Sequence, residues 1–157
     1  MNLFLLNLIL ALAFAAVFGS ITVPALIGGY ALGYLALWAT RPLYGDTPYF
    51  RRSVGLVRLT GFFLWELVVS SLRVAWDVVT PQNKSKPGIL AMPLEVESDI
   101  EIMLLANLIS LTPGTLSLDV SEDRRHLYVH AMFVDDESAL VAELKTGMER
   151  RVLEAMR

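Results

Sequence analysis

The first forty residues are apolar, and no charged side chain occurs before Arg41. The run is much longer than the ~20 residues that span a bilayer, and the short polar connection Gly19–Thr22 divides it. We therefore predict two membrane helices, Leu3–Phe18 and Val23–Ala39, that form a transmembrane hairpin over residues 1–40. A secretory signal peptide is the alternative, but it would require a basic start and no second apolar segment directly after it.

Small residues recur at four-residue intervals on both predicted helices, with Ala11 and Ala15 on the first and Gly29 and Gly33 on the second. Stripes of this kind let two helix backbones approach closely. Gly29 and Gly33 are therefore candidate contacts with a neighbouring subunit. The alternative is that they reflect only the general abundance of alanine and glycine in membrane helices.

The segment 54–80 has the period of one long helix, which Pro81 ends. Its polar side chains fall on one face: Glu66, Ser70, Arg73 and Asp77. The pattern fits an amphipathic helix on the membrane surface, and it also fits a third membrane helix whose polar face packs on partner proteins. We favour the surface helix, because a third span would carry Lys84 and Lys86 to the outer side of the membrane.

Basic residues set the predicted orientation. Three arginines follow the hairpin in the connection 41–53, whereas the connection inside the hairpin has no charge. Because cytoplasmic loops are enriched in lysine and arginine, we expect the N-terminus and residues 41–53 in the cytoplasm. The polar segment 81–87, with a proline at each end, is then a linker to a cytoplasmic domain over residues 88–157.

That C-terminal domain has the pattern β-α-β-β-α. Gly88–Val96 predicts a strand, and Pro93 indicates an edge strand or a bulge. A capping-box pattern, Ser98–Glu101, begins a helix that ends at Leu111, and after a hairpin Asp135–Glu137 begins a final helix. The predicted fold is a membrane α-helical N-terminal half followed by a small α+β domain, in which both helices cover one face of a three-stranded sheet.

Both strands of the predicted hairpin alternate between apolar and polar residues. The first strand points Leu116, Leu118 and Val120 to one side. The return strand matches them with its own apolar face, which consists of Leu127, Val129, Ala131 and Phe133.

The helix before this hairpin is ended by Thr112, Pro113 and Gly114, because proline removes a backbone donor and glycine allows unusual backbone angles. These three residues are also candidate contacts with another subunit. Their role as a helix stop explains them without any such contact.

Composition and charge agree with a membrane protein that carries an acidic domain. Hydrophobic residues make up 55% of the chain and its mean hydropathy is +0.54. Residues 1–88 carry seven basic and three acidic side chains, and residues 89–157 carry six basic and thirteen acidic ones. An acidic domain argues against nucleic-acid binding, and the absence of cysteine excludes disulfides and thiolate metal sites.

Candidate chemistry is sparse, and no pattern indicates an enzyme, a cofactor or a metal centre. His126 and His130 are the only histidines, and on one strand they would lie ~13 Å apart, too far to bind one ion. Glu66 is the acid that would lie at membrane depth in a spanning helix, where carboxylates often belong to ion paths. The alternative is that Glu66 forms an ion pair with Arg73, which is itself a candidate subunit contact.

The run SLTPGTLSLDVSEDRRHLYVHAM over Ser110–Met132 resembles the signature region of the E subunit of the Mrp-type (Mnh/Pha) multisubunit Na+/H+ antiporters. The segments WELVVSSLRVAWDV and KPGIL extend the resemblance over the whole chain. It implies a multi-pass subunit of a bacterial inner-membrane complex that exchanges cytoplasmic Na+ for external H+. The implied partners are other antiporter subunits and the lipid bilayer.

The membrane part is too small to transport ions alone, because two or three helices cannot build a site between structural repeats. The hairpin also has no charged group that could bind an ion. We therefore expect an accessory subunit that is needed for assembly and helps to form an ion path. The alternative is a free-standing membrane-anchored module whose α/β domain recruits a soluble partner or a lipid.

Overall fold

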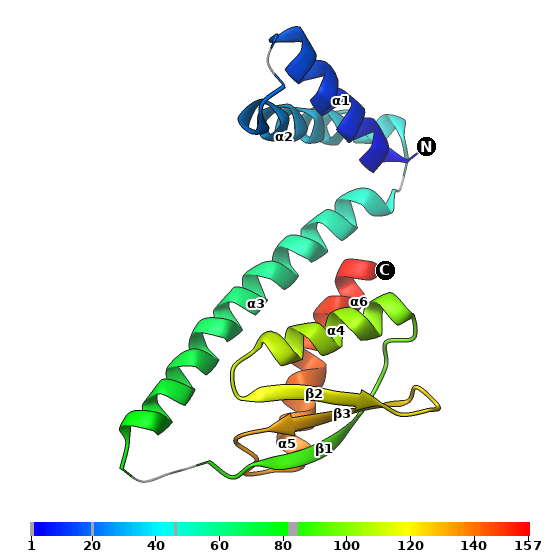
Figure 1. The fold of residues 1–157 in the computed structure, drawn as a ribbon. Coiled ribbons are helices and arrows are strands. Elements are labelled where there is room, and N and C mark those ends of the chain that lie inside the picture. The colour runs from blue at the N-terminus through cyan, green and yellow to red at the C-terminus, as the bar shows by residue number, and fades with distance from the viewer. Residues whose placement is uncertain (1, 20, 46, 82–84) are drawn as a thin grey trace. The chain divides into compact units, whose positions relative to one another are not determined.

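The computed structural model describes residues 2–19, 21–45, 47–81 and 85–157. The chain divides into two compact units, Met1–Arg51 and Arg52–Arg157. The first unit contains two apolar helices, α1 (Leu3–Val17) and α2 (Val23–Ala39), and a 3-10 turn at Arg41–Leu43 (Figure 1). Both helices match the predicted segments to within a residue.

The predicted stripes of small residues meet inside this hairpin. Ala11, Ala15, Gly29 and Gly33 are all buried. A Cβ atom at Gly29 would lie 2.9 Å from the carbonyl oxygen of Ala11, which is closer than side chains normally approach. The two backbones therefore pack against each other in the way that the small residues predict.

The long helix α3 (Pro48–Val79) has 32 residues and begins six residues before the predicted start. Proline is favourable at a first helical position, so the connection after the hairpin is shorter than predicted. Among the described residues, α3 is the helix long and apolar enough to cross a membrane, whereas α1 and α2 are shorter apolar helices.

The second unit has the predicted order of elements after α3. They are β1 (Gly88–Pro93), α4 (Asp99–Leu111), β2 (Thr115–Val120) and β3 (His126–Ala131). The last helix consists of α5 (Glu137–Leu144), a π-helical turn at Lys145–Glu149, and α6 (Arg150–Met156). The predicted helix starts are confirmed, since Ser98 and Glu101 form a capping box and Asp136 caps α5.

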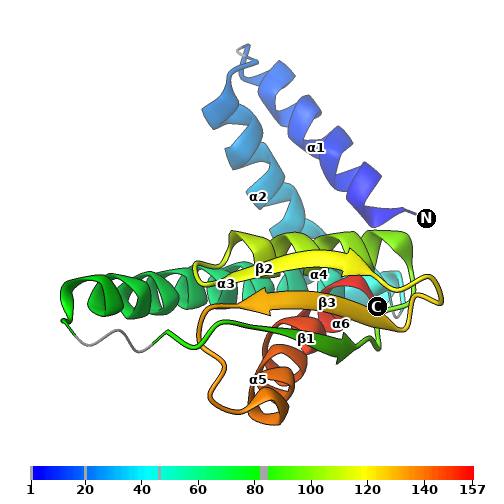
Figure 2. The ribbon, with the colours of Figure 1, turned by 60° about the horizontal axis from the view of Figure 1, so that its bottom comes forward.

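The three strands are antiparallel and lie side by side in the order β1-β3-β2 (Figure 2). Strand β1 is an edge strand, as Pro93 indicates. The end of the predicted linker joins this sheet, because the N–H of Lys86 donates to the carbonyl of Met132 at 3.0 Å and the carbonyl of Lys86 accepts from Val134. Residues 82–84 of the linker lie outside the described residues.

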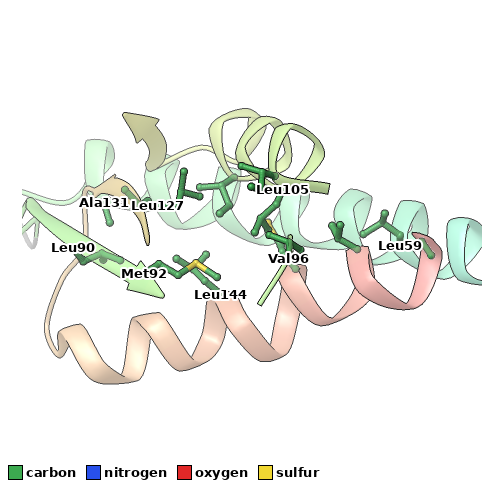
Figure 3. Packing of buried hydrophobic residues seen from close by; sticks show 14 residues of the cluster. Leu59, Leu90, Met92, Val96, Leu105, Leu127, Ala131 and Leu144 are labelled. Carbon is green, nitrogen blue, oxygen red and sulfur yellow. The ribbon is translucent and has the colours of Figure 1, made fainter. Parts of the chain in front are cut away.

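The core lies between one face of the sheet and the helices (Figure 3). The sheet contributes Leu90, Met92, Leu127, Val129 and Ala131, α4 contributes Ile102, Leu105 and Ile109, and the last helix contributes Leu144, Met148, Val152 and Ala155. Helix α3 adds Leu59, which is only 5% exposed. Both predicted helices thus cover the same face of the sheet, and α3 packs onto them.

The register of the hairpin contradicts the prediction that β2 and β3 match their apolar faces. Leu116 pairs with His130, and Ser117 pairs with Val129. Because Val129 is fully buried, Ser117 lies on the core face of the sheet. Leu116 and Leu118 lie on the open face instead, where they are 49% and 48% exposed.

Hydrogen bonds explain how a serine can occupy the core face of β2. The Ser117 hydroxyl donates to the carbonyl of Ala106 at 3.0 Å, and its N–H donates to the hydroxyl of Ser110 at 3.1 Å. A register shift between Ser117 and Asp119 then returns Val120 to the core, because a bulge changes the side to which later residues point. The alternating pattern alone did not reveal this bulge.

Candidate functional site between α3 and the α/β domain

Helix α3 contacts the α/β domain at several points between Gly55 and Val74. A Cβ atom at Gly55 would lie 2.7 Å from a carbonyl oxygen of α6, so the two backbones are in contact there. About two turns later, the guanidinium of Arg151 lies 3.7 Å from the ring centroid of Phe62. Near the other end, Val74 packs next to Gly114 in the loop after α4.

Arg151 links the last helix of the domain to α3. Its guanidinium donates to the carbonyls of Thr146 and Gly147, at 3.2 and 2.7 Å. These carbonyls belong to the π-helical turn, which interrupts the regular hydrogen bonds of the helix. The same guanidinium lies over the ring of Phe62, so Arg151 holds the π-helical turn and α3 together by hydrogen bonds and a cation–π contact.

A cavity of about 330 Å³ lies between α3 and the domain. It brings together five residues that the sequence singled out: Glu66 and Arg73 from α3, and Thr112, Pro113 and Gly114 from the loop after α4. Positions about forty residues apart thus line one site. A volume of this size is at the lower end of the range for ligand-binding pockets.

The remaining lining of this cavity comes from β3, the segment that follows it and the last helix, with Phe62 added by α3. Apolar side chains form much of the lining: Phe62, Phe133, Leu140, Leu144 and Met148. Polar side chains are added by Glu143, Thr146 and Arg151. The sequence did not point to these three residues, because nothing local to the last helix indicates that α3 packs beside it.

The two faces of α3 have different surroundings. Its polar face turns toward the domain: Ser70 is 6% exposed, and its hydroxyl donates to the carbonyl of Glu66 at 2.6 Å. The opposite face is apolar and exposed, and includes Val57, Leu64, Trp65, Val68, Leu72 and Val79. The stripe predicted from the sequence is therefore confirmed, and the structure shows that its polar side lines a cavity.

Gly29 and Gly33 are not part of this cavity, because the structure places them in the contact between α1 and α2. A Cβ atom at Gly33 would collide with the side-chain oxygen of Asn7. Asn7 is completely buried, and its amide nitrogen donates to the hydroxyl of Tyr49 at 2.9 Å. The hydroxyl of Tyr49 lies 3.0 Å from that of Tyr30. Asn7 was not among the residues singled out from the sequence, although it is the one polar residue in α1.

Two buried carboxylates hold the domain together by accepting backbone hydrogen bonds. Glu149 is 1% exposed and accepts from the N–H of Val96 at 3.2 Å. Glu101 accepts from the N–H groups of Ser98 and Glu97, both at 3.1 Å. The bond from Ser98 is the main cause that lowers the pKa of Glu101 below its ordinary value of 4.5, because it favours the ionised carboxylate.

The two histidines lie on β3 and point to the open face of the sheet, as their spacing predicts. Among the described residues no group of three or more His, Asp or Glu side chains is arranged to hold a metal ion.

Comparisons with known proteins agree over nearly the whole chain. A family model described as "Na+/H+ ion antiporter subunit" matches residues 7–155. The Na(+)/H(+) antiporter E subunit of Alkalihalophilus pseudofirmus is 35% identical over 150 residues, which cover 96% of this chain and 95% of that one. The E subunit of the Bacillus subtilis antiporter is 34% identical over 153 residues, with 98% and 97% covered.

Two solved structures are also similar. A chain of the Mrp complex from Dietzia sp. is 30% identical, with a TM-score of 0.52 over 65% of this chain and 96% of that chain. A chain of an archaeal membrane-bound sulfane sulfur reductase has the same fold, with a TM-score of 0.59, 24% identity, and 97% and 98% of the two chains covered. Taken with the match over residues 7–155, the identities above 30% show that this chain belongs to the E-subunit family of Na+/H+ antiporters.

Proposed function

We propose that the chain is an accessory, non-enzymatic subunit of a multisubunit Na+/H+ antiporter in the bacterial inner membrane. It associates with other antiporter subunits, is needed for their assembly, and contributes to an ion path that the larger subunits build. The names of its relatives and the presence of a similar chain in an Mrp complex support this function.

The arrangement of α3 is the observation that carries our proposal for the membrane topology. Its contacts with the domain run from Gly55 to Val74, a rise of about 28 Å at 1.5 Å per residue. This length is nearly the whole ~30 Å hydrocarbon core. If α3 crossed the membrane, the charged domain packed along it would enter the hydrocarbon, which is very unfavourable.

A position on the membrane surface avoids this conflict. The apolar face of α3 would then rest on the bilayer, with Trp65 at the interface, and the domain would lie in the cytoplasm. We therefore propose that α1 and α2 cross the membrane and that residues 54–80 lie on its cytoplasmic surface, although α3 is long enough to span.

Cysteine labelling tests this topology, because the natural chain contains no cysteine. We expect Ile21→Cys, in the connection between α1 and α2, to react with an impermeant maleimide added to intact cells. We expect Glu122→Cys, at the exposed turn of the β2–β3 hairpin, to react only after the membrane is permeabilised. Labelling of Glu122→Cys from outside would show that α3 crosses the membrane.

Deletion of the gene in the native host tests the function itself. We expect loss of Na+-dependent antiport in everted vesicles together with loss of the assembled complex. If antiport and assembly both persist, the chain is a free-standing membrane-anchored module and our proposal is wrong.

An ion-path role for Glu66 needs a separate test, because the structure places this residue against the domain. The variant Glu66→Gln keeps the shape of the side chain and removes its charge. If Glu66 contributes to the ion path, the complex will assemble normally but antiport will fall. Normal antiport with Glu66→Gln would exclude the role.

A further inference from the structure

A second cavity, of about 390 Å³, adjoins the first on the domain side of α3. The two share the lining residues Arg73, Phe133, Leu140 and Glu143. Together they form one groove, here called the α3 groove, which runs between α3 and the α5 side of the domain.

The α3 groove combines an apolar floor with acidic walls. Its floor includes Phe133, Leu140 and Leu144. Five carboxylates line the two cavities, Glu66, Asp77, Asp135, Asp136 and Glu143, against two guanidiniums, Arg73 and Arg151.

The groove has fewer positive groups than carboxylates. Arg151 is engaged with two carbonyls and the ring of Phe62. Lys86 pairs with Asp135 at 2.7 Å, which neutralises one acid. Asp77 has a partner of its own and is not counted here, so Glu66, Asp136 and Glu143 remain against Arg73 and Arg151 once Asp135 is also set aside. The groove therefore remains net negative, in keeping with the acidic excess of residues 89–157, and a positively charged occupant would be attracted to it.

We propose that the α3 groove binds a basic cytoplasmic loop of another membrane subunit of the same complex. An apolar side chain of that loop packs on Leu140 and Phe133, and a lysine or arginine beside it meets Glu66 and Glu143. The inference deepens the proposed function and rests on it, because it identifies where the accessory subunit holds a neighbour.

Two general arguments favour this occupant. Cytoplasmic loops of membrane proteins carry an excess of lysine and arginine, which complements the carboxylates of a groove on the cytoplasmic side. An anionic lipid headgroup would be repelled by the same carboxylates, and the apolar face that suits lipid chains is on the opposite side of α3. A segment that supplies both an apolar anchor and a positive charge matches both parts of the lining.

Site-specific photocrosslinking in assembled membranes is the first test. A benzophenone amino acid at Ala139, an exposed residue that lines the groove, should give a covalent adduct with another antiporter subunit. The same amino acid at Tyr128, on the open face of the sheet, is the matched control and should not. The inference is overturned if Ala139 gives no protein adduct in a complex that is assembled, or if both positions give the same adduct.

Charge reversal is the second test. We expect Glu143→Lys, and more strongly Glu66→Lys with Glu143→Lys, to reduce recovery of the other subunits with a tagged chain about tenfold in mild detergent, because like charges would then face each other. The control, Glu97→Lys with Glu122→Lys, has the same change in net charge at exposed positions outside the groove and should leave recovery unchanged. Limited proteolysis should show that all variants keep a folded domain.

The outcomes separate the two proposals. If the wild-type chain recovers the other subunits and the groove variants do so equally well, the groove inference is wrong and the proposed function stands. If the wild-type chain recovers no other subunit, the proposed function itself is wrong. If the control variants lose recovery as much as the groove variants, binding depends on general charge and the inference is again wrong.

Discussion

Substitution of Gly55 by alanine should separate α3 from the domain. The added Cβ atom would lie 2.7 and 2.8 Å from backbone atoms of Glu154 and Ala155 in α6. Backbone atoms cannot move aside as the end of a flexible side chain can, so the two helices must shift. Gly61 is the matched control, because it lies in the same helix and a Cβ atom there would meet nothing within 4 Å.

The magnitude follows from two opposing effects. Replacing glycine by alanine inside a helix stabilises it by about 0.5–1 kcal/mol, and this gain is the same at both positions. At Gly55 the helices must separate by about 0.7 Å to restore an ordinary contact, and overpacking of this kind costs about 1–3 kcal/mol. We therefore expect Gly61→Ala to stabilise α3 by about 0.5–1 kcal/mol and Gly55→Ala to destabilise its docking by up to ~2 kcal/mol.

Hydrogen exchange measured by mass spectrometry on the full chain in nanodiscs provides the assay. The free energy of local opening should fall in Gly55→Ala for the first half of α3 and for α6 together, because the two helices lose the same contact. It should rise in α3 alone for Gly61→Ala. If both variants raise the protection of α3 equally, α3 is not packed on α6, and this contact no longer supports a surface position of α3.

Three further predictions concern packing and buried charge. Gly33→Ala should destabilise the α1–α2 hairpin by about 1–3 kcal/mol, because the new methyl group collides with Asn7. Gly28→Ala is the control and should not destabilise the hairpin, because a Cβ atom there meets open space. Hydrogen exchange of the hairpin amides compares the two variants. Glu149→Ala should destabilise the domain by about 3 kcal/mol, because it leaves buried N–H groups without an acceptor, as measured by urea unfolding in detergent. Because the pKa of Glu101 is lowered in the folded protein, its ionised carboxylate stabilises the folded state above about pH 4.5, and this stabilisation is lost as the pH falls further. In Glu101→Gln, the free energy of unfolding should therefore decrease less between about pH 5 and 3 than in the wild-type chain.

Local signals in the sequence predicted the elements of this chain well. The capping box at Ser98 and Glu101 and the N-cap at Asp136 depend on residues within one turn, so they can be read without knowledge of the fold. The stripes of Gly29 and Gly33 predicted a close helix contact for the same reason. The π-helical turn at Lys145–Glu149 had no such signal, because Glu149 is bound by the distant N–H of Glu95 and Arg151 is held over Phe62 of α3.

The prediction of which face of β2 enters the core was wrong. Leu116 and Leu118 look like core residues, because alternation with polar neighbours is typical of a half-buried strand. Their face is decided by the pairing of Ser117 with Val129, and by the partners that Ser110 and Ala106 of α4 offer to Ser117. These partners satisfy a buried hydroxyl that would otherwise be costly, and no pattern within the strand itself reveals them.

The membrane position of α3 is inferred from its polar stripe and from the structure together. Glu66, Ser70 and Arg73 on one face are compatible with a helix on the membrane surface and with a span that packs on partner proteins, because both need one apolar and one polar side. The structure adds that this polar side already packs on the chain's own domain, from Gly55 to Val74. Contacts between this polar face and a charged domain, spread over nearly the thickness of a bilayer, argue against a position of α3 inside the membrane. The same packing creates the α3 groove, so the feature that argues for a surface position of α3 also supplies the site at which we propose that a neighbouring subunit binds.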